Sequence, residues 1–396
     1  MAKRRVVGAM AALVLVVLAV GAATVDWRFW YRWHNLPKDP GEWPASYYQP
    51  KHQLPGNEQA FFPIASDVER SVPGDTLESA AAWAEAHNSA ALLILHRGKI
   101  QLERYWQDIG PDSLFTGRAM TRSLLPPLVA VAMSDGHIGS LDDPVGRYLN
   151  EWRDDARGKI TLRQLLQNIS GLENPPLAGD PDPMAKNAQV SLSSDFRKAA
   201  LNFDLENTPG TFFGLSNANA QLIGAVLESA TGVPYEDYLN DRLWSLLGAG
   251  PAELYMDRPR GMPAVYCCFR ATPRDWLRYG AALATDGMVN GQRIWPEGWT
   301  QQMATPSAIY PNYGLQLWVG NPPNSDRRPY IQGQEMSVPH GPPVESERFF
   351  FLEGGGYRTM IVLPEEELVI LRLGYYHPEW QTSALPNLIL AGINAP

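Results

Sequence analysis

The order of strand-like and helix-like segments along the chain is the feature that most restricts its fold. Two apolar runs, 91–95 and 100–105, flank the turn sequence HRGK and predict a β-hairpin. Strand-like runs return only near the end of the chain, at 349–352, 357–363 and 368–373. Between these two groups, the apolar spacing is typical of helices. The pattern predicts an α/β protein of the α+β type, in which an antiparallel sheet built from both chain ends is flanked by helices and interrupted by a helical insertion.

The predicted helices have recognisable starts and stops. Thr161 is a favourable N-terminal cap for a short helix, and Gly136 and Gly232 follow helical stretches at positions where glycine commonly ends a helix. The longer helices are expected at 77–87, 128–135, 218–230, 234–247 and 273–285.

Composition divides the 396 residues into three regions. Residues 1–25 combine three early basic residues with an uncharged run, 6–25, that is long enough to cross a hydrocarbon core of about 30 Å. Because positive charge stays on the cytoplasmic side, this segment predicts a single-pass inner-membrane anchor with the remainder in the periplasm. The small residues at 21–23 leave open a cleaved signal peptide and a secreted protein. Residues 26–75, rich in proline and aromatic residues, are expected to form a stalk that wraps onto the main domain at 76–396.

Charge and cysteine content exclude several functions. The net charge is −9, and no dense basic run occurs beyond the N-terminus, so a nucleic-acid partner is not expected. The two cysteines, Cys267 and Cys268, are adjacent, and we expect two small buried side chains that do not bridge. The seven histidines show no spacing typical of a metal site, so neither a metal nor an organic cofactor is expected.

Several short phrases then occur in a fixed order and spacing. They are 135–149 (DGHIGSLDDPVGRYL), 159–166 (KITLRQLL), 170–172 (SGL), 209–217 (PGTFFGLSN), 271–276 (ATPRDW) and 313–318 (YGLQLW). Together they resemble the β-lactamase-related serine hydrolases, which are similar to penicillin-binding proteins, and especially the branch of 6-aminohexanoate-dimer hydrolases and related esterases. The resemblance covers about residues 77–375, and it implies a serine hydrolase domain at 76–396 with a helical subdomain at about 119–285.

The family performs its chemistry with three motifs, S-x-x-K, Y-x-N and K/H/S-x-G. A serine hydroxyl is a weak nucleophile near neutral pH and needs a neighbouring base. A lysine one helical turn later lies on the same face and can accept the proton, and a tyrosine can relay it.

In this chain the resemblance places the motifs on residues that cannot perform those roles. Ala119 stands at the nucleophile position and Arg122 at the position of the base, although a guanidinium does not deprotonate in proteins. Leu215 replaces the relaying tyrosine, while Asn217 is kept, and the third motif falls on Glu353. Ser123 and Ser216 are the nearest surviving hydroxyls and are considered as substitute nucleophiles.

Two structural expectations follow from this altered site. We expect Arg122 and Glu353 to form an ion pair across the old cleft, because an unpaired buried charge costs several kcal/mol. Pro126 and Pro127 are tolerated only in the first turn of a helix, so the regular helix should begin near Ser123 or Leu124. Ser123 is then a candidate N-terminal cap, with 119–122 in a loop or distorted turn.

The predicted function is that of a cell-envelope homologue that is inactive by the standard mechanism and retains a cleft for a small molecule, a peptide or a protein partner. The alternative is an active amide or ester hydrolase that forms an acyl-enzyme through an atypical nucleophile. A third possibility is a purely structural domain held at the membrane.

Overall fold

The computed structural model describes residues 25–37, 44–175, 182–323, 326–327, 330–331, 334–335 and 338–395. The expected anchor or signal sequence at 1–25 therefore lies outside the described residues, apart from Val25. No helix within the described part of the chain has the length and apolar character needed to cross a membrane.

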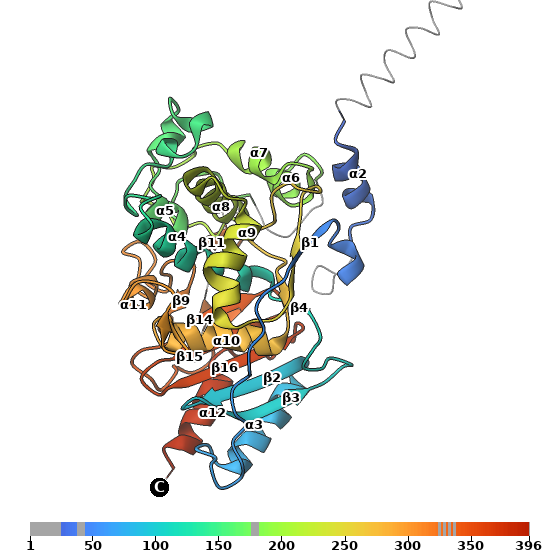
Figure 1. The fold of residues 1–396 in the computed structure, drawn as a ribbon, viewed down its shortest axis with the longest axis vertical. Helices are drawn as coiled ribbons and strands as arrows, with labels where there is room; N and C mark the ends of the chain where they lie inside the picture. Colours follow the sequence, from blue (N-terminus) through green and yellow to red (C-terminus); the bar gives the residue numbers. More distant parts are fainter. Residues whose placement is uncertain are drawn as a thin grey trace, which may run out of the picture.

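A six-stranded antiparallel sheet forms the lower half of the molecule in Figure 1. Its strands, in spatial order, are β3 (Lys99–Tyr105), β2 (Ser89–His96), β16 (Leu368–Gly374), β15 (Arg358–Leu363), β14 (Phe350–Gly354) and β9 (Trp318–Val319). The early hairpin β2–β3 pairs with the late strand β16, with Ile94 opposite Ile370. The prediction of one antiparallel sheet built from both chain ends is confirmed.

Helices cover both faces of this sheet. The helices α3 (Gly74–Ala86) and α12 (Ala384–Ile393) pack together on one face, and α10 (Pro273–Ala284) lies on the other (Figure 1). Every residue of β2, β15 and β16 is buried. This two-sided burial explains why the strands read as continuous apolar runs and not as alternating ones.

Most of the remaining helices lie above the sheet in Figure 1, with α11 (Trp299–Met303) beside the sheet edge at β9, and short 3₁₀ or π turns occur between them. The remaining helices also include α4 (Leu125–Ser134), α5 (Leu162–Leu166), α6 (Lys186–Leu192), α7 (Phe196–Leu201), α8 (Asn217–Thr231) and α9 (Tyr235–Leu239). Thr161 and Gln164 form a capping box at the start of α5, as the sequence predicted for Thr161. Helix α8 ends at Gly232, whose φ of 71° is in the left-handed region that favours glycine.

A second, four-stranded sheet ties the N-terminal segment to the body of the protein. Its order is β1 (Lys51–Leu54), β5 (Ala252–Tyr255), β6 (Arg270–Ala271) and β4 (Phe115–Thr116). The short pairs β7 (Met288–Val289) with β8 (Gln292–Arg293), β10 (Asp326–Arg327) with β13 (Val338–Pro339), and β11 (Tyr330–Ile331) with β12 (Gln334–Glu335) complete the described strands.

Helix α2 (Trp27–His34) is fastened to the domain by the buried side chain of Arg32. Its guanidinium donates to five main-chain carbonyls, those of Gln49, Leu192, Ser193, Met256 and Asp257, at 2.7–3.1 Å. The opposite side of α2 exposes Trp27, Trp30 and Tyr31.

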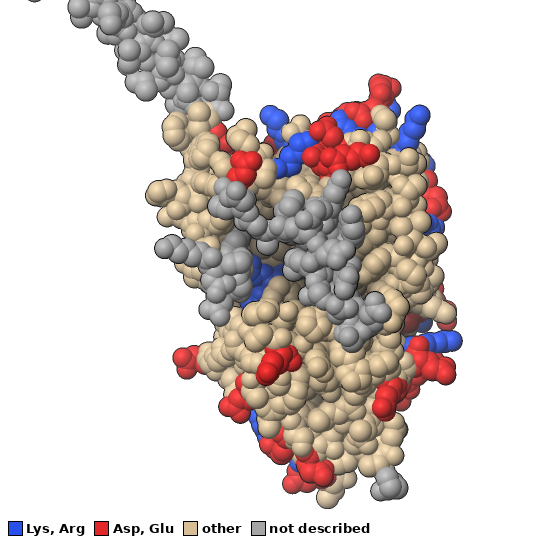
Figure 2. All heavy atoms as spheres, turned by 180° about the vertical axis from the view of Figure 1, so that it is seen from behind, with Lys and Arg blue, Asp and Glu red and all other residues tan. Residues whose placement is uncertain are grey.

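Charges of both signs are mixed on the face shown in Figure 2. Lys and Arg side chains lie among Asp and Glu at the top of this view, and acidic side chains are frequent lower down. Among the described residues of this face, basic side chains do not gather into a broad patch.

Candidate active site

The first motif lies in a short 3₁₀ helix, η2 (Arg118–Leu124), which packs against the end of β14. The backbones of η2 and β14 approach so closely that a Cβ added to Gly354 would lie 2.3 Å from the carbonyl oxygen of Gly117. Two further contacts fix η2 from the other side. The main-chain N–H of Gly117 donates to the carbonyl of Phe269, and the N–H of Phe269 donates to Oγ1 of Thr121 at 3.3 Å. The backbone around Ala119 is therefore held by both glycine-mediated packing and hydrogen bonds.

The regular helix α4 begins at Leu125, with Pro126 and Pro127 in its first turn, where missing N–H groups do no harm. Residues 119–122 lie in η2, the distorted turn that the sequence predicted. The expectation that Ser123 caps the helix is wrong. Because η2 continues directly into α4, Ser123 is inside a helical stretch, and its hydroxyl donates to the carbonyl of Met120 at 2.7 Å.

The second motif forms the start of α8. Ser216 caps this helix, since its Oγ accepts a hydrogen bond from the N–H of Ala218 at 3.2 Å. The N–H of Ser216 donates to Oδ1 of Asn168, a buried side chain that also accepts from Asn219. These bonds fix the direction in which Leu215 and Asn217 leave the backbone.

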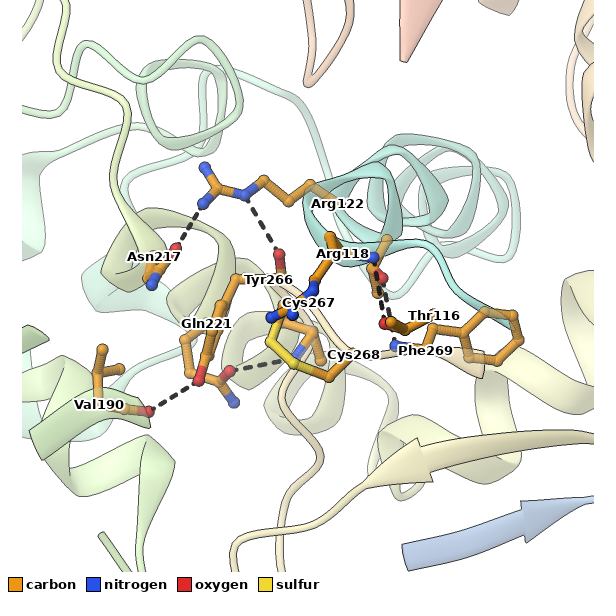
Figure 3. The surroundings of a disulfide bond; sticks show 12 residues. Thr116, Arg118, Arg122, Val190, Asn217, Gln221, Tyr266, Cys267, Cys268 and Phe269 are labelled. Atoms are coloured by element: carbon orange, nitrogen blue, oxygen red, sulfur yellow. Dashed lines mark hydrogen bonds between the residues drawn. A yellow bond between two sulfur atoms is a disulfide. The ribbon is translucent and has the colours of Figure 1, made fainter. Parts of the chain in front are cut away.

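Arg122 joins the first two motifs. Figure 3 shows its side chain reaching from η2 to Asn217, where Nη2 donates to Oδ1 at 2.5 Å. Nε donates to the carbonyl of Tyr266 at 3.3 Å, and Nη1 to that of Ser216 at 3.5 Å. Burial lowers the pKa of Arg122, an effect that the nearby Tyr313 and Tyr266 oppose. An arginine nonetheless stays protonated in proteins, so a buried positive charge remains.

The expected ion pair between Arg122 and Glu353 does not form. Both side chains border the same cavity, but the guanidinium turns towards neutral oxygen acceptors on the other side. The described carboxylates include none within ion-pair distance of Arg122. The charge at the position of the family's base is therefore held by neutral acceptors.

One small cavity collects residues from all three motifs. Ala119, Arg122, Leu215 and Glu353 line it, together with Met120, Tyr313, Gln316, Trp318 and Leu352. Its volume is about 20 Å³, close to the space that one water molecule needs. The first motif presents a methyl group and a guanidinium to this cavity, and neither of these can attack a carbonyl carbon.

The two substitute nucleophiles considered from the sequence do not line this cavity. Ser123 and Ser216 are both about 98–99% buried, and their hydroxyls are engaged with main-chain groups of Met120 and Ala218. Activation of a serine requires a base within hydrogen-bonding reach. Both hydroxyls instead form hydrogen bonds with main-chain groups.

Five residues of the cavity had no predicted role, and three of these five come from one sequence motif. Tyr313, Gln316 and Trp318 belong to the phrase YGLQLW, which carried the resemblance without a site assignment. The hydroxyl of Tyr313 lies 3.2 Å from both the Asn168 amide and Oε1 of Gln316, and burial raises its pKa. The signal available in the sequence was the motif YGLQLW itself, which places aromatic and amide side chains close together.

Cys267 and Cys268 form a disulfide beside this site, so the expectation of two unbridged cysteines is wrong. Cys268 has a φ of 75°, and this left-handed backbone turns the adjacent sulfur atoms towards each other. The flanking Tyr266 accepts the hydrogen bond from Arg122 (Figure 3). The flanking Phe269 donates its N–H to Thr121. The cavity itself is lined by neither cysteine nor histidine.

Solved structures of other proteins share the fold of this chain. Of solved structures, a Bacillus anthracis protein named for 6-aminohexanoate-dimer hydrolase superposes with a TM-score of 0.65 at 18% identity, covering 88% of this chain and 89% of that one. A penicillin-binding-protein homologue from Caulobacter crescentus superposes with a TM-score of 0.61 at 15% identity, covering 84% of this chain and all of that one. At such identities these similarities establish the serine β-lactamase and transpeptidase fold.

Sequence relatives cover less of the chain. Protein flp of Staphylococcus aureus is 24% identical over 163 residues, which are 38% of this chain and 32% of the relative. This chain thus spans about a third of the length of that curated relative. The family model described as Beta-lactamase matches residues 75–374, which is more than half of the chain. This protein therefore belongs to the Beta-lactamase family of serine-hydrolase-related proteins.

Proposed function

We propose that this protein is a non-hydrolytic member of its family that binds a ligand at the remodelled site. The observation that carries the proposal is the pair of groups on η2. Ala119 places a methyl where a nucleophilic oxygen would stand, and Arg122 places a permanent cation, held by Asn217, where a neutral amine would accept the proton. Acyl-enzyme chemistry needs both an attacking oxygen and a proton acceptor.

The charge at the site supports an anionic ligand. Arg122 is buried, and among the described residues its hydrogen bonds go to neutral acceptors, so a ligand carboxylate would supply a direct counter-charge. The cavity of about 20 Å³ is too small for more than one chemical group. The ligand we propose is a peptide or small cell-wall fragment that rests over the mouth of the cavity and directs a terminal carboxylate towards Arg122.

A location at the cell envelope belongs to the same proposal, with the main domain outside the cytoplasm. The basic residues and apolar run at 1–25 support it, as does the disulfide between Cys267 and Cys268, because disulfides persist in oxidising compartments. The exposed Trp27, Trp30 and Tyr31 of α2 directly follow that run, and aromatic side chains favour the membrane interface. Fractionation of cells that express the full chain, with protease added from outside, tests the location.

Covalent labelling tests the loss of catalysis. The full chain is incubated with a fluorophosphonate probe and with a fluorescent penicillin, and an active serine penicillin-binding protein serves as positive control. We expect no labelled adduct on this protein. Stoichiometric labelling of one serine, located by mass spectrometry, would establish the alternative of an active amide or ester hydrolase.

Thermal unfolding tests the ligand class, because a molecule that binds only the native state must stabilise it. Short peptides with a free C-terminal carboxylate are compared with the same peptides amidated at the C-terminus. We expect the free acids alone to raise the melting temperature, and Arg122→Met to abolish the difference. Equal shifts with both forms would reject a site built for a carboxylate.

A further inference from the structure

A cluster of metal-binding side chains lies away from the cavity, where the end of α3 meets the segment after β16. His87, His377 and Glu379 each offer one ligand atom, and these atoms lie within 4.8 Å of one another. We propose that the three residues bind a divalent transition metal of the Zn²⁺ class. The site is independent of the proposed function, because none of its residues lines the cavity of Arg122.

His87 is already oriented as a metal ligand. It follows the last turn of α3, and its Nδ1 lies 2.7 Å from the carbonyl oxygen of Trp83. A carbonyl can only accept, so Nδ1 carries the hydrogen and Nε2 keeps its lone pair. This backbone contact is the arrangement that commonly fixes the tautomer of a metal-bound histidine. The imidazole also stacks on the indole of Trp83, with ring centres 3.9 Å apart and planes inclined by 19°.

The other two ligands belong to one short turn. The N–H of Trp380 donates to the carbonyl of His377, and the N–H of Glu379 lies 3.3 Å from Nδ1 of His377. Trp380 is 1% exposed and packs against Trp83, with ring centres 5.0 Å apart. The same tryptophan pair therefore positions the turn against the end of α3, which brings the rings of His87 and His377 to 4.9 Å.

The donor set selects the class of metal. Two imidazole nitrogens and one carboxylate oxygen suit Zn²⁺, Ni²⁺ or Cu²⁺, whereas Mg²⁺ and Ca²⁺ prefer oxygen ligands alone. Bonds of about 2.0–2.2 Å to zinc require ligand atoms about 3.4 Å apart in a tetrahedron. The three ligand atoms already lie within 4.8 Å of one another, and the side chain of Glu379 is exposed and can adjust its position. Three protein ligands leave a fourth coordination position open to solvent.

Metal binding would link two parts of the domain that are distant in sequence. His87 ends the helix that opens the domain, and His377 follows the last strand of the sheet. Neighbouring contacts already join these segments, since the N–H of Tyr375 donates to the carbonyl of Asn88 at 3.0 Å. A bound ion would reinforce this junction, so the free energy of unfolding should rise with the concentration of free metal above the dissociation constant.

Calorimetric titration of the metal-free full chain with ZnCl₂ tests the site. We expect saturable binding of one Zn²⁺ per chain. His377→Gln should weaken that binding at least about tenfold, and Glu379→Gln should weaken it to a smaller extent. His137→Gln is the matched control, because His137 is an exposed histidine elsewhere and its loss should leave the affinity unchanged. Equal affinities for the wild type and His377→Gln, or an equal loss in the control, would overturn the proposal.

Thermal unfolding gives a second readout that does not depend on stoichiometry. Zn²⁺ should raise the melting temperature of the wild type and of His137→Gln, and MgCl₂ at the same concentration should not. Both substituted ligands lie in a turn with exposed or half-exposed side chains, so their variants should fold, and near-ultraviolet circular dichroism checks this. A Zn²⁺ shift that persists in the double variant His377→Gln/Glu379→Gln would show that the metal binds elsewhere.

Discussion

The guanidinium of Arg122 donates to the side-chain oxygen of Asn217 at 2.5 Å, joining the first helical motif to the start of α8. By resemblance to the serine hydrolases, Arg122 stands at the lysine position of the S-x-x-K motif, and Asn217 is the asparagine of the Y-x-N motif. Here they form a hydrogen bond between a buried cation and a neutral amide. This contact ties η2 to the start of α8, so substitutions at either residue should change the stability of the domain.

Replacement of Asn217 tests whether Arg122 lacks a counter-charge. Asn217→Asp supplies a carboxylate in the same place at the N-terminus of α8, where negative charge is also favoured by the helix dipole. We expect the free energy of unfolding to rise by about 1–2 kcal/mol at pH 7, because a charged acceptor forms the stronger bond. Asn217→Ala should lower it by about 1–3 kcal/mol, since a buried donor loses its partner. Urea unfolding measures both, and destabilisation by both variants alike would show that Arg122 is already neutralised.

Restoring the serine alone should not restore acylation. In Ala119→Ser the new hydroxyl would face Arg122, which cannot accept its proton, and Leu215, which cannot relay it. We expect no labelling of the single variant by a fluorophosphonate probe. The triple variant Ala119→Ser/Arg122→Lys/Leu215→Tyr should become labelled, because it regains a nucleophile, a base and a relay on the same framework. Rapid labelling of the single variant would mean that another base serves the site.

The sequence predicted the framework of this site because its signals are local. Apolar runs indicate the strands and helices, and glycines mark the ends of helices. The sequence segments between 135 and 318 that resemble the family determine which residues align with the three catalytic motifs. As a result, Ala119, Arg122, Leu215 and Glu353 were named from the sequence, and the structure brings all four to one cavity. The position of Pro126 likewise predicted a helix that starts late, because proline is tolerated only in the first turn.

The contacts that were not predicted depend on distant backbone. Arg122 turns away from Glu353 because the carbonyl of Tyr266, 144 residues later, offers an acceptor on the other side. The disulfide joins two adjacent cysteines, and Cys268 has a left-handed φ that the sequence does not indicate. His87 and His377 meet only because the last strand pairs with the early hairpin, so no short-range spacing revealed them.

Arg32 provides a stability test of the N-terminal segment. An ammonium cannot reach the five carbonyls that the guanidinium spans, so Arg32→Lys should lower the free energy of unfolding by about 2–4 kcal/mol. Limited proteolysis should then cut the chain near α2 more rapidly. Arg28→Lys, on the same helix but only partly buried, is the matched control and should change stability by less than about 0.5 kcal/mol. Equal effects of the two substitutions would mean that these carbonyl contacts contribute little.

Stability should depend on pH through the carboxyl group of Glu228 in α8. Burial raises its pKa from 4.5 to about 7, although its Oε1 accepts a hydrogen bond from the N–H of Tyr235 at 3.1 Å. A carboxyl group with a raised folded-state pKa contributes its full stability below the unfolded value, and this contribution is lost as the pH rises through about 7.

The variant Glu228→Gln isolates this effect, because glutamine keeps the acceptor and never ionises. The variant and the wild type should be about equally stable at pH 4.5, and the variant should be more stable by about 3 kcal/mol at pH 8. The comparison is necessary because burial also raises the pKa of Asp257, to about 6, and this group changes the stability of both proteins in the same direction. Chemical denaturation at several pH values measures the difference. A difference that stays constant from pH 4.5 to 8 would show that Glu228 remains ionised, and therefore solvated, in the folded protein.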